Sequence, residues 1–176
     1  MKAKNATILF LPDYDGASDD HWLTRWQTKL STGRKLHLER ETDPTSADGK
    51  AALAVEIDAT EKPVVLVGHG LGASLAVLAA HDHPDRVRGA FLVAPRDLEG
   101  SAFGPYPREP LPFPSLVVAS RNDPHCAFAV AEDLAGAWGS LFIDGGDIGR
   151  INEESGHGPW PEGSLTFARF VSRLPD

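Results

Sequence analysis

The chain has 176 residues, which is the size of one domain, so we expect a single domain over residues 1–176. Its 25 acidic residues outnumber its 17 lysines and arginines, and the net charge of −8 argues against nucleic-acid and anionic-membrane partners. The one cysteine, Cys126, excludes an internal disulfide and a cysteine-based zinc site, and no histidine spacing suggests a metal. The apolar run at 6–12 is too short for a signal peptide or a membrane helix. We therefore expect a cytoplasmic protein that needs no cofactor.

Short apolar segments alternate with helical ones along the chain. The apolar segments are continuous rather than alternating with polar residues, which is typical of strands buried on both faces of a parallel sheet. The pattern predicts a three-layer α/β domain, with a mostly parallel sheet, helices on both faces and right-handed crossovers. In chain order we expect a strand at 7–11, a helix at 21–30, a weak strand at 35–39, a helix at 50–59, a strand at 64–67, a helix at 72–81, strands at 90–93 and 115–119, a helix at 128–138, a strand at 140–143 and a helix at 164–174.

Two long loops interrupt this alternation. Residues 100–114 contain five prolines, and residues 145–163 are rich in glycine. Long loops in a compact domain often carry function, but capping of the sheet explains them equally well.

The sharpest local feature is the turn Gly68-His69-Gly70-Leu71-Gly72 between a predicted buried strand and a predicted buried helix. With a serine at position 70 it would read Gly-x-Ser-x-Gly, the nucleophile elbow of α/β hydrolases. The flanking glycines allow strand and helix to approach closely. Gly70 supplies no nucleophile, so the acyl-enzyme route is closed. Ser74, one helical turn further on, is expected to be buried and unable to substitute.

A dinucleotide-binding fingerprint is the competing interpretation of this turn. Residues 68–73 also match Gly-x-Gly-x-x-Ala between a strand and a helix. The motif is weak alone, and it usually stands in the first strand–helix unit, whereas here a strand and helices precede it.

Several segments together resemble the small serine hydrolases of the retinoblastoma-binding protein nine and bacterial YdeN type, and the resemblance covers nearly the whole chain. The segments that carry it are Leu11-Pro12, HWLTRW at 21–26, GHGLGA at 68–73, VAP at 93–95, PLPFPSLVVASRNDPHC at 110–126, WGS at 138–140 and INEESGHGPWPEG at 151–163. The resemblance implies an α/β-hydrolase fold and a triad in the order Ser, Asp, His.

Carried over by position, the resemblance makes Asp123 the triad acid, and that match is good. The nucleophile position is Gly70 and the base position is Arg150, so both depart from the family pattern. Asp13 stands where the loop after the first strand usually has a glycine that serves the oxyanion hole. Its carboxylate would oppose the negative charge that develops in the transition state. Three departures at three chemical positions indicate a triad lost by divergence.

We expect Arg150 to pair with Asp123, because a buried carboxylate without its histidine would otherwise be uncompensated. Removal of the elbow side chain should widen the pocket near Gly70, Asp13, Tyr14, Leu71 and Arg150. Trp22 and Trp160 are expected to wall this pocket. His157 is either a displaced base or a residue that stabilises its loop, and His69 is expected to be structural.

Three functions follow from these observations. The first is a serine-hydrolase-family protein with an incomplete triad that binds a small ligand or a protein partner. The second is an active esterase or amidase that uses a bound water with His157 or Asp13. The third is a nucleotide-binding module at Gly68–Ala73.

Overall fold

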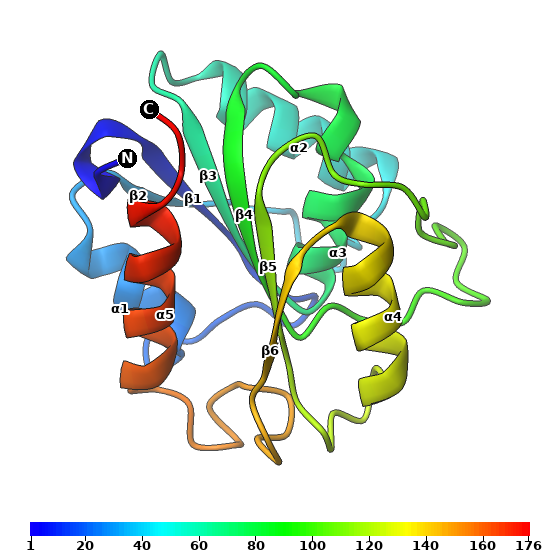
Figure 1. Cartoon of the computed structure of the whole chain (residues 1–176). Helices are drawn as coiled ribbons and strands as arrows, with labels where there is room; N and C mark the ends of the chain where they lie inside the picture. Colours follow the sequence, from blue (N-terminus) through cyan, green and yellow to red (C-terminus); the bar gives the residue numbers. More distant parts are fainter.

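A six-stranded, wholly parallel sheet forms the centre of the computed structural model, which describes residues 1–176 (Figure 1). The strands follow the spatial order β2-β1-β3-β4-β5-β6. Their bounds are β1 Thr7–Leu11, β2 Gly33–Lys35, β3 Val64–His69, β4 Val87–Val93, β5 Ser115–Ala119 and β6 Leu141–Asp144. The α/β architecture predicted from the alternating segments is confirmed.

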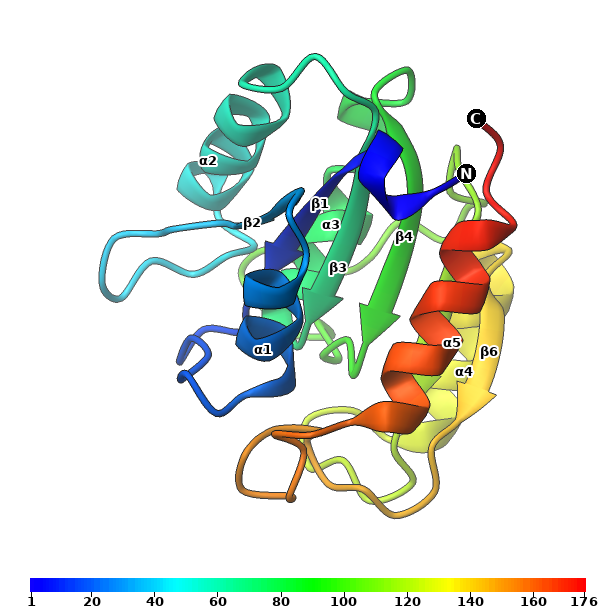
Figure 2. The same cartoon turned by 90° about the vertical axis from the view of Figure 1, so that its left-hand side faces the viewer.

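Helices cover both faces of the sheet, as Figures 1 and 2 show. Helices α1 (Trp22–Lys29) and α5 (Pro161–Ser172) pack on one face. Helices α2 (Ala47–Asp58), α3 (Leu71–Leu78) and α4 (Phe128–Trp138) pack on the other. Two short 3-10 turns lie at Ala3–Asn5 and Ala80–Asp82. No helix combines the length and the apolar composition that a bilayer-spanning segment needs.

The continuous apolar strands contribute side chains to two separate hydrophobic cores, one on each face of the sheet. In β1, Leu9 and Leu11 join the core under α2, α3 and α4, whereas Ile8 and Phe10 join the core under α1 and α5. Successive side chains of a strand point to opposite faces, so both sets must be apolar when helices cover both sides. This is why the central strands show no polar alternation.

Element boundaries differ from the predictions at several helix ends, at β2 and at β4, which begins at Val87 rather than 90. Helix α2 begins at 47 rather than 50, because the Ser46 side chain accepts a hydrogen bond from the Gly49 amide and caps the helix. Helix α5 begins at Pro161 rather than 164, since proline fits the first helical position. The predicted strand at 35–39 overlaps the real β2 only at Lys35. Helix α3 ends at Leu78, and a 3-10 turn takes up residues 80–82.

The two long loops have different roles. The proline-rich loop packs Tyr106 against Trp138, with ring centroids 5.0 Å apart, and so covers the core on the α3 and α4 side. The loop after β6 returns across the carboxyl ends of the strands before it enters α5 (Figure 2). In open parallel sheets ligand sites lie at these ends, so this second loop is placed to contribute to a site.

Candidate active site

The turn between β3 and α3 has the backbone conformation of a nucleophile elbow. Gly70 lies at its tip with φ 55° and ψ −124°, and its amide donates to the Val93 carbonyl. A Cβ on Gly72 would lie 2.0 Å from the Leu11 carbonyl oxygen, so only glycine permits this approach of helix to strand. The elbow predicted from the spacing of the glycines is present.

The place of the missing side chain at the elbow is filled by the carboxylate of Asp13. A Cβ built on Gly70 would lie 2.2 Å from Asp13 Cγ, far inside van der Waals contact. The Asp13 side chain is 2% exposed. A serine at position 70 therefore cannot be accommodated unless Asp13 moves.

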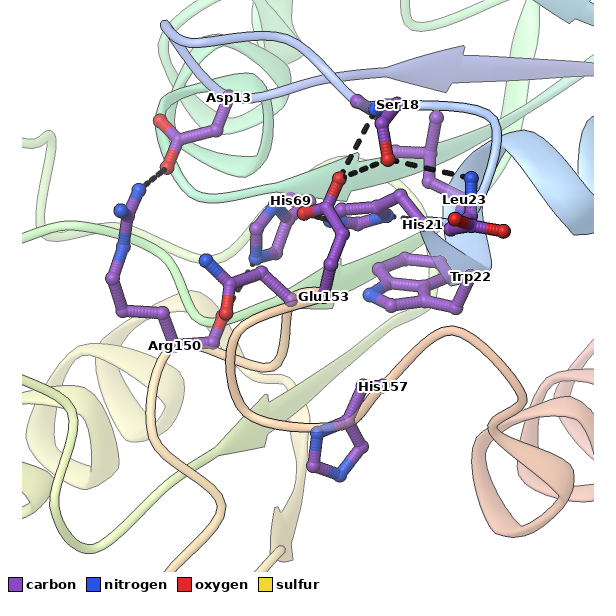
Figure 3. A network of polar contacts seen from close by, with 12 residues as sticks. Asp13, Ser18, His21, Trp22, Leu23, His69, Arg150, Glu153 and His157 are labelled. Carbon is purple, nitrogen blue, oxygen red and sulfur yellow. Dashed lines mark hydrogen bonds and ion pairs between the residues drawn. The ribbon is translucent and has the colours of Figure 1, made fainter.

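Four donors hold the Asp13 carboxylate. Oδ1 accepts from the backbone amides of Leu71 at 2.9 Å and Tyr14 at 2.8 Å. Oδ2 accepts from the guanidinium groups of Arg96 and Arg150, both at 2.9 Å (Figure 3 shows Arg150). In an α/β hydrolase the amide after the nucleophile is one of the two oxyanion-hole donors. In this protein a side-chain carboxylate has taken that donor.

The charge on Asp13 is strongly favoured. Burial acts to raise the pKa of this carboxyl, but the field of His69 at acidic pH, where its ring is protonated, and the hydrogen bonds from Arg96 and the Leu71 amide outweigh it and bring the pKa to about 2. Burial lowers the pKa of His69 itself, so its imidazole is neutral near pH 7 and the guanidinium groups carry the positive charge. Asp13 is therefore ionised throughout the physiological range.

The expected widening of the elbow pocket is wrong. The space bordered by Asp13, Gly70, Arg96, Asp123 and Arg150 has about 0 Å³ that a water-sized sphere can enter. The space that opens when a triad serine and histidine are absent is filled here by the Asp13 carboxylate and the guanidinium groups of Arg96 and Arg150. Tyr14 contributes its amide, but the residue is 49% exposed and its hydroxyl contacts the Glu41 carbonyl instead.

The predicted Asp123–Arg150 ion pair is also wrong. Arg150 pairs with Asp13 at 2.9 Å and reaches Asp15 at 3.5 Å. Asp123 is half-buried at the same space, but its carboxylate accepts from the His125 amide at 2.9 Å. Burial raises the pKa of Asp123 and outweighs the opposite effect of the hydrogen bond from the His125 amide. The carboxyl is therefore more easily protonated, and its neutral form needs no cation as a partner.

A second polar network lies directly behind the elbow (Figure 3). His69 Nε2 contacts the Arg150 carbonyl oxygen at 2.7 Å, so this nitrogen must carry the proton. His21 Nδ1 accepts from the Leu23 amide and caps α1, which leaves the proton on Nε2. The two rings lie 4.8 Å apart, and His69 Nδ1 and His21 Nε2 have no hydrogen-bond partner. His69 is thus a structural link between the elbow and the Arg150 loop, as expected.

His157 stands apart from the elbow. Its Nδ1 bonds to Ser155 Oγ at 2.8 Å within the loop, and its ring packs edge-on to Trp160. This supports the loop-stabilising interpretation over the displaced base. Ser74 is 0% exposed and bonds to the Tyr106 hydroxyl, so it is buried as expected.

Trp22 and Trp160 do not wall the elbow. Trp22 is fully buried and donates its Nε1 proton to the Ile151 carbonyl at 2.8 Å. Trp160 stacks on Trp26, with centroids 5.6 Å apart, and lines a different cavity between α1 and α5. Both rings face the α1 and α5 core, because Trp22 begins α1, Trp160 immediately precedes α5, and these helices cover that side of the sheet.

The prediction from sequence missed Arg96 and His125 as residues of the site. Both lie just beyond the carboxyl ends of strands, Arg96 after β4 and His125 in the loop after β5. That position was the available signal, because residues following parallel strands converge at one edge of the sheet.

Comparison with known proteins supports the fold described above. The family model described as "Serine hydrolase" matches residues 8–169. Among solved structures, a putative YdeN-like hydrolase from Pectobacterium atrosepticum is 29% identical, with a TM-score of 0.91 over 98% of this chain and 95% of that chain. The ydeN gene product of B. subtilis is 17% identical, with a TM-score of 0.75 over 96% of this chain and 100% of that chain, and so shows the fold alone. A search of curated proteins found no match.

Proposed function

Because this chain belongs to the serine hydrolase family yet holds a carboxylate where the reacting oxyanion has to form, we propose that it acts by binding and not by acyl-enzyme hydrolysis. One observation carries the proposal: Asp13 Oδ1 accepts the Leu71 amide proton at 2.9 Å beside a Gly70 that has no side chain. The site therefore lacks the nucleophile and presents negative charge to an acyl group. Loss of a nucleophile from a working triad costs on the order of a million-fold in rate.

The alternative of a water-based hydrolase finds little support in this geometry. No water-sized volume exists at the elbow, and the pKa of about 2 makes Asp13 a very weak base. His157 is engaged by Ser155 in its own loop. A hydrolase of this kind would need a rearrangement that breaks both Asp13–arginine pairs.

The nucleotide-binding alternative meets a similar obstacle. A diphosphate would need the free amides at the start of α3, and the Leu71 amide is already bound by a carboxylate. A Cβ on Gly68 would lie 2.5 Å from Ala73 Cα, so this glycine is explained by the packing of strand against helix. The binding function is therefore that of an α/β-hydrolase scaffold, with a small molecule or a protein as its ligand.

The test compares the wild-type chain with two designed variants, using a fluorophosphonate probe and short-chain p-nitrophenyl esters. We expect no labelling and no turnover of the wild type. The double variant Gly70→Ser with Arg150→His should also show no labelling and no turnover, because Asp13 still occupies the elbow. The triple variant that adds Asp13→Gly should be labelled at residue 70.

A control keeps the result specific to the triad. Within the triple variant, Asp123→Asn should lower turnover by about 10⁴-fold if the elbow, the base and Asp123 act together. Labelling of the wild type at any serine, with turnover lost when that serine is changed, would overturn the proposal.

A further inference from the structure

A cavity of about 700 Å³ opens between α1 and α5, on the face of the sheet that Figure 2 presents. Its floor is formed by stacked aromatic rings: Trp26 lies 5.6 Å from Trp160 and 5.5 Å from Phe167, centroid to centroid, at small interplanar angles. Cavities that hold drug-sized ligands measure roughly 300–1,000 Å³ and are largely apolar. This cavity has the size and the floor of a small-molecule site, whereas the elbow has no space at all.

The side chains along α5 keep the cavity open. Ser164, Ala168 and Ser172 are spaced four apart, lie on one face of the helix and are all exposed. None of them is large enough to reach across to α1. Trp26, Trp160 and Phe167 are 9%, 7% and 6% exposed, so the cavity reaches only the outer parts of these packed rings.

The charged groups at the cavity are all positive. Lys2, Arg25 and Lys29 line it, and no Asp or Glu does, although the chain carries a net charge of −8. Arg25 contacts the exposed Asp20 at 3.4 Å, and the two lysines form no ion pair. An apolar floor with a cationic rim complements a molecule that has an apolar body and one anionic end.

We propose that this cavity binds an aliphatic carboxylate, with the hydrocarbon chain between α1 and α5 against Leu30, Ala168 and the exposed parts of the aromatic rings, and the carboxylate at Lys2 and Lys29. Removal of the hydrocarbon chain from water contributes to the free energy of binding. The lysines select the anionic head, and their contribution weakens as salt screens it. The site is separate from the elbow, so the inference does not depend on whether the elbow is inactive.

The test is a calorimetric titration of the full chain with sodium decanoate below its micelle concentration, with decanol and decyltrimethylammonium as uncharged and cationic counterparts. We expect saturable 1:1 binding of decanoate and weaker binding of both counterparts. Tryptophan fluorescence should change with the same binding curve, because two of the floor rings are indoles.

Three variants locate the site. Ala168→Trp fills the cavity from an exposed position and should abolish binding. The double variant Lys2→Glu with Lys29→Glu should weaken decanoate binding by about tenfold and leave decanol binding unchanged. The matched control Lys50→Glu, on α2 across the sheet, should bind as the wild type does.

Four outcomes would overturn the proposal. They are no saturable binding of decanoate, equal affinity for decanol, binding that survives Ala168→Trp in a folded protein, and a dimer in sedimentation that Ala168→Trp dissociates. The last result would show that a second copy of the chain covers this cavity.

Discussion

Removal of the Asp13 carboxylate should leave Arg96 and Arg150 facing one another without a counter-charge. Lowering of the Asp13 pKa from 3.8 to about 2 corresponds to about 2 kcal/mol of stabilisation of the folded state. Breaking a buried ion pair by removing one partner costs about 3–5 kcal/mol. The two arginine side chains are 22% and 21% exposed and can recover some hydration, so we expect Asp13→Ala to cost about 2–3 kcal/mol.

The assay is urea unfolding at pH 7 in chloride and in formate buffers of equal ionic strength. The cavity left by Asp13→Ala offers two guanidinium groups and two backbone amides to a small carboxylate. Formate at ten times its dissociation constant should restore about 1.4 kcal/mol to the variant and nothing to the wild type.

A neighbouring residue supplies the control for this experiment. Asp15 is exposed and touches Arg150 only at 3.5 Å, so Asp15→Ala should change stability by less than about 0.5 kcal/mol. The wild type should lose the Asp13 contribution as pH falls from 3.8 towards 2, because the unfolded carboxyl takes up its proton first. An Asp13→Ala variant as stable as the wild type, or indifferent to formate, would refute the assignment of Asp13 as the counter-charge.

Three further substitutions test the fold. Burial, followed by repulsion from His69, lowers the pKa of His21 to about 3, so the free energy of unfolding should decrease as pH falls below 6.5, by about 2 kcal/mol at pH 5. His21→Asn keeps a cap for α1. In urea unfolding it should reduce the number of protons taken up on unfolding at acidic pH by up to one. Gly136→Ala meets nothing within 4 Å inside α4 and should raise the unfolding free energy by about 0.5–1 kcal/mol. Gly72→Ala places a methyl 2.0 Å from the Leu11 carbonyl oxygen and should lower the thermal midpoint or prevent folding, and a stable variant would contradict the elbow geometry.

The elbow and the sheet could be predicted from the sequence because local chemistry determines both. A run such as 116–119, apolar at every position, is typical of a strand covered on both faces, and it lies in β5, which is such a strand. Glycines at 68 and 72 allow an approach of strand and helix that larger residues forbid, so their spacing between a strand and a helix indicates the elbow.

The partner of Arg150 could not be predicted, because two acids were available and position decides between them. Leu11 lies beside Gly68 in the sheet register, so the chain that leaves β1 carries Asp13 directly over the elbow. Asp123 lies in a loop that turns back on its own His125 amide. Sequence spacing contains no information about which carboxylate lies nearer to a guanidinium that is 137 residues from one and 27 from the other.

The contacts between Asp13 and the elbow have a consequence for how a Ser–Asp–His triad could arise here by mutation. The single change Gly70→Ser places a side chain in collision with Asp13. Asp13→Gly leaves two guanidinium groups without a counter-charge, and Arg150→His removes one of the two guanidinium groups that neutralise the buried carboxylate. Every single step back towards a triad is therefore penalised before any rate is gained. Under the proposed binding function, selection on such a chain can more readily change other surfaces than build a triad at this elbow.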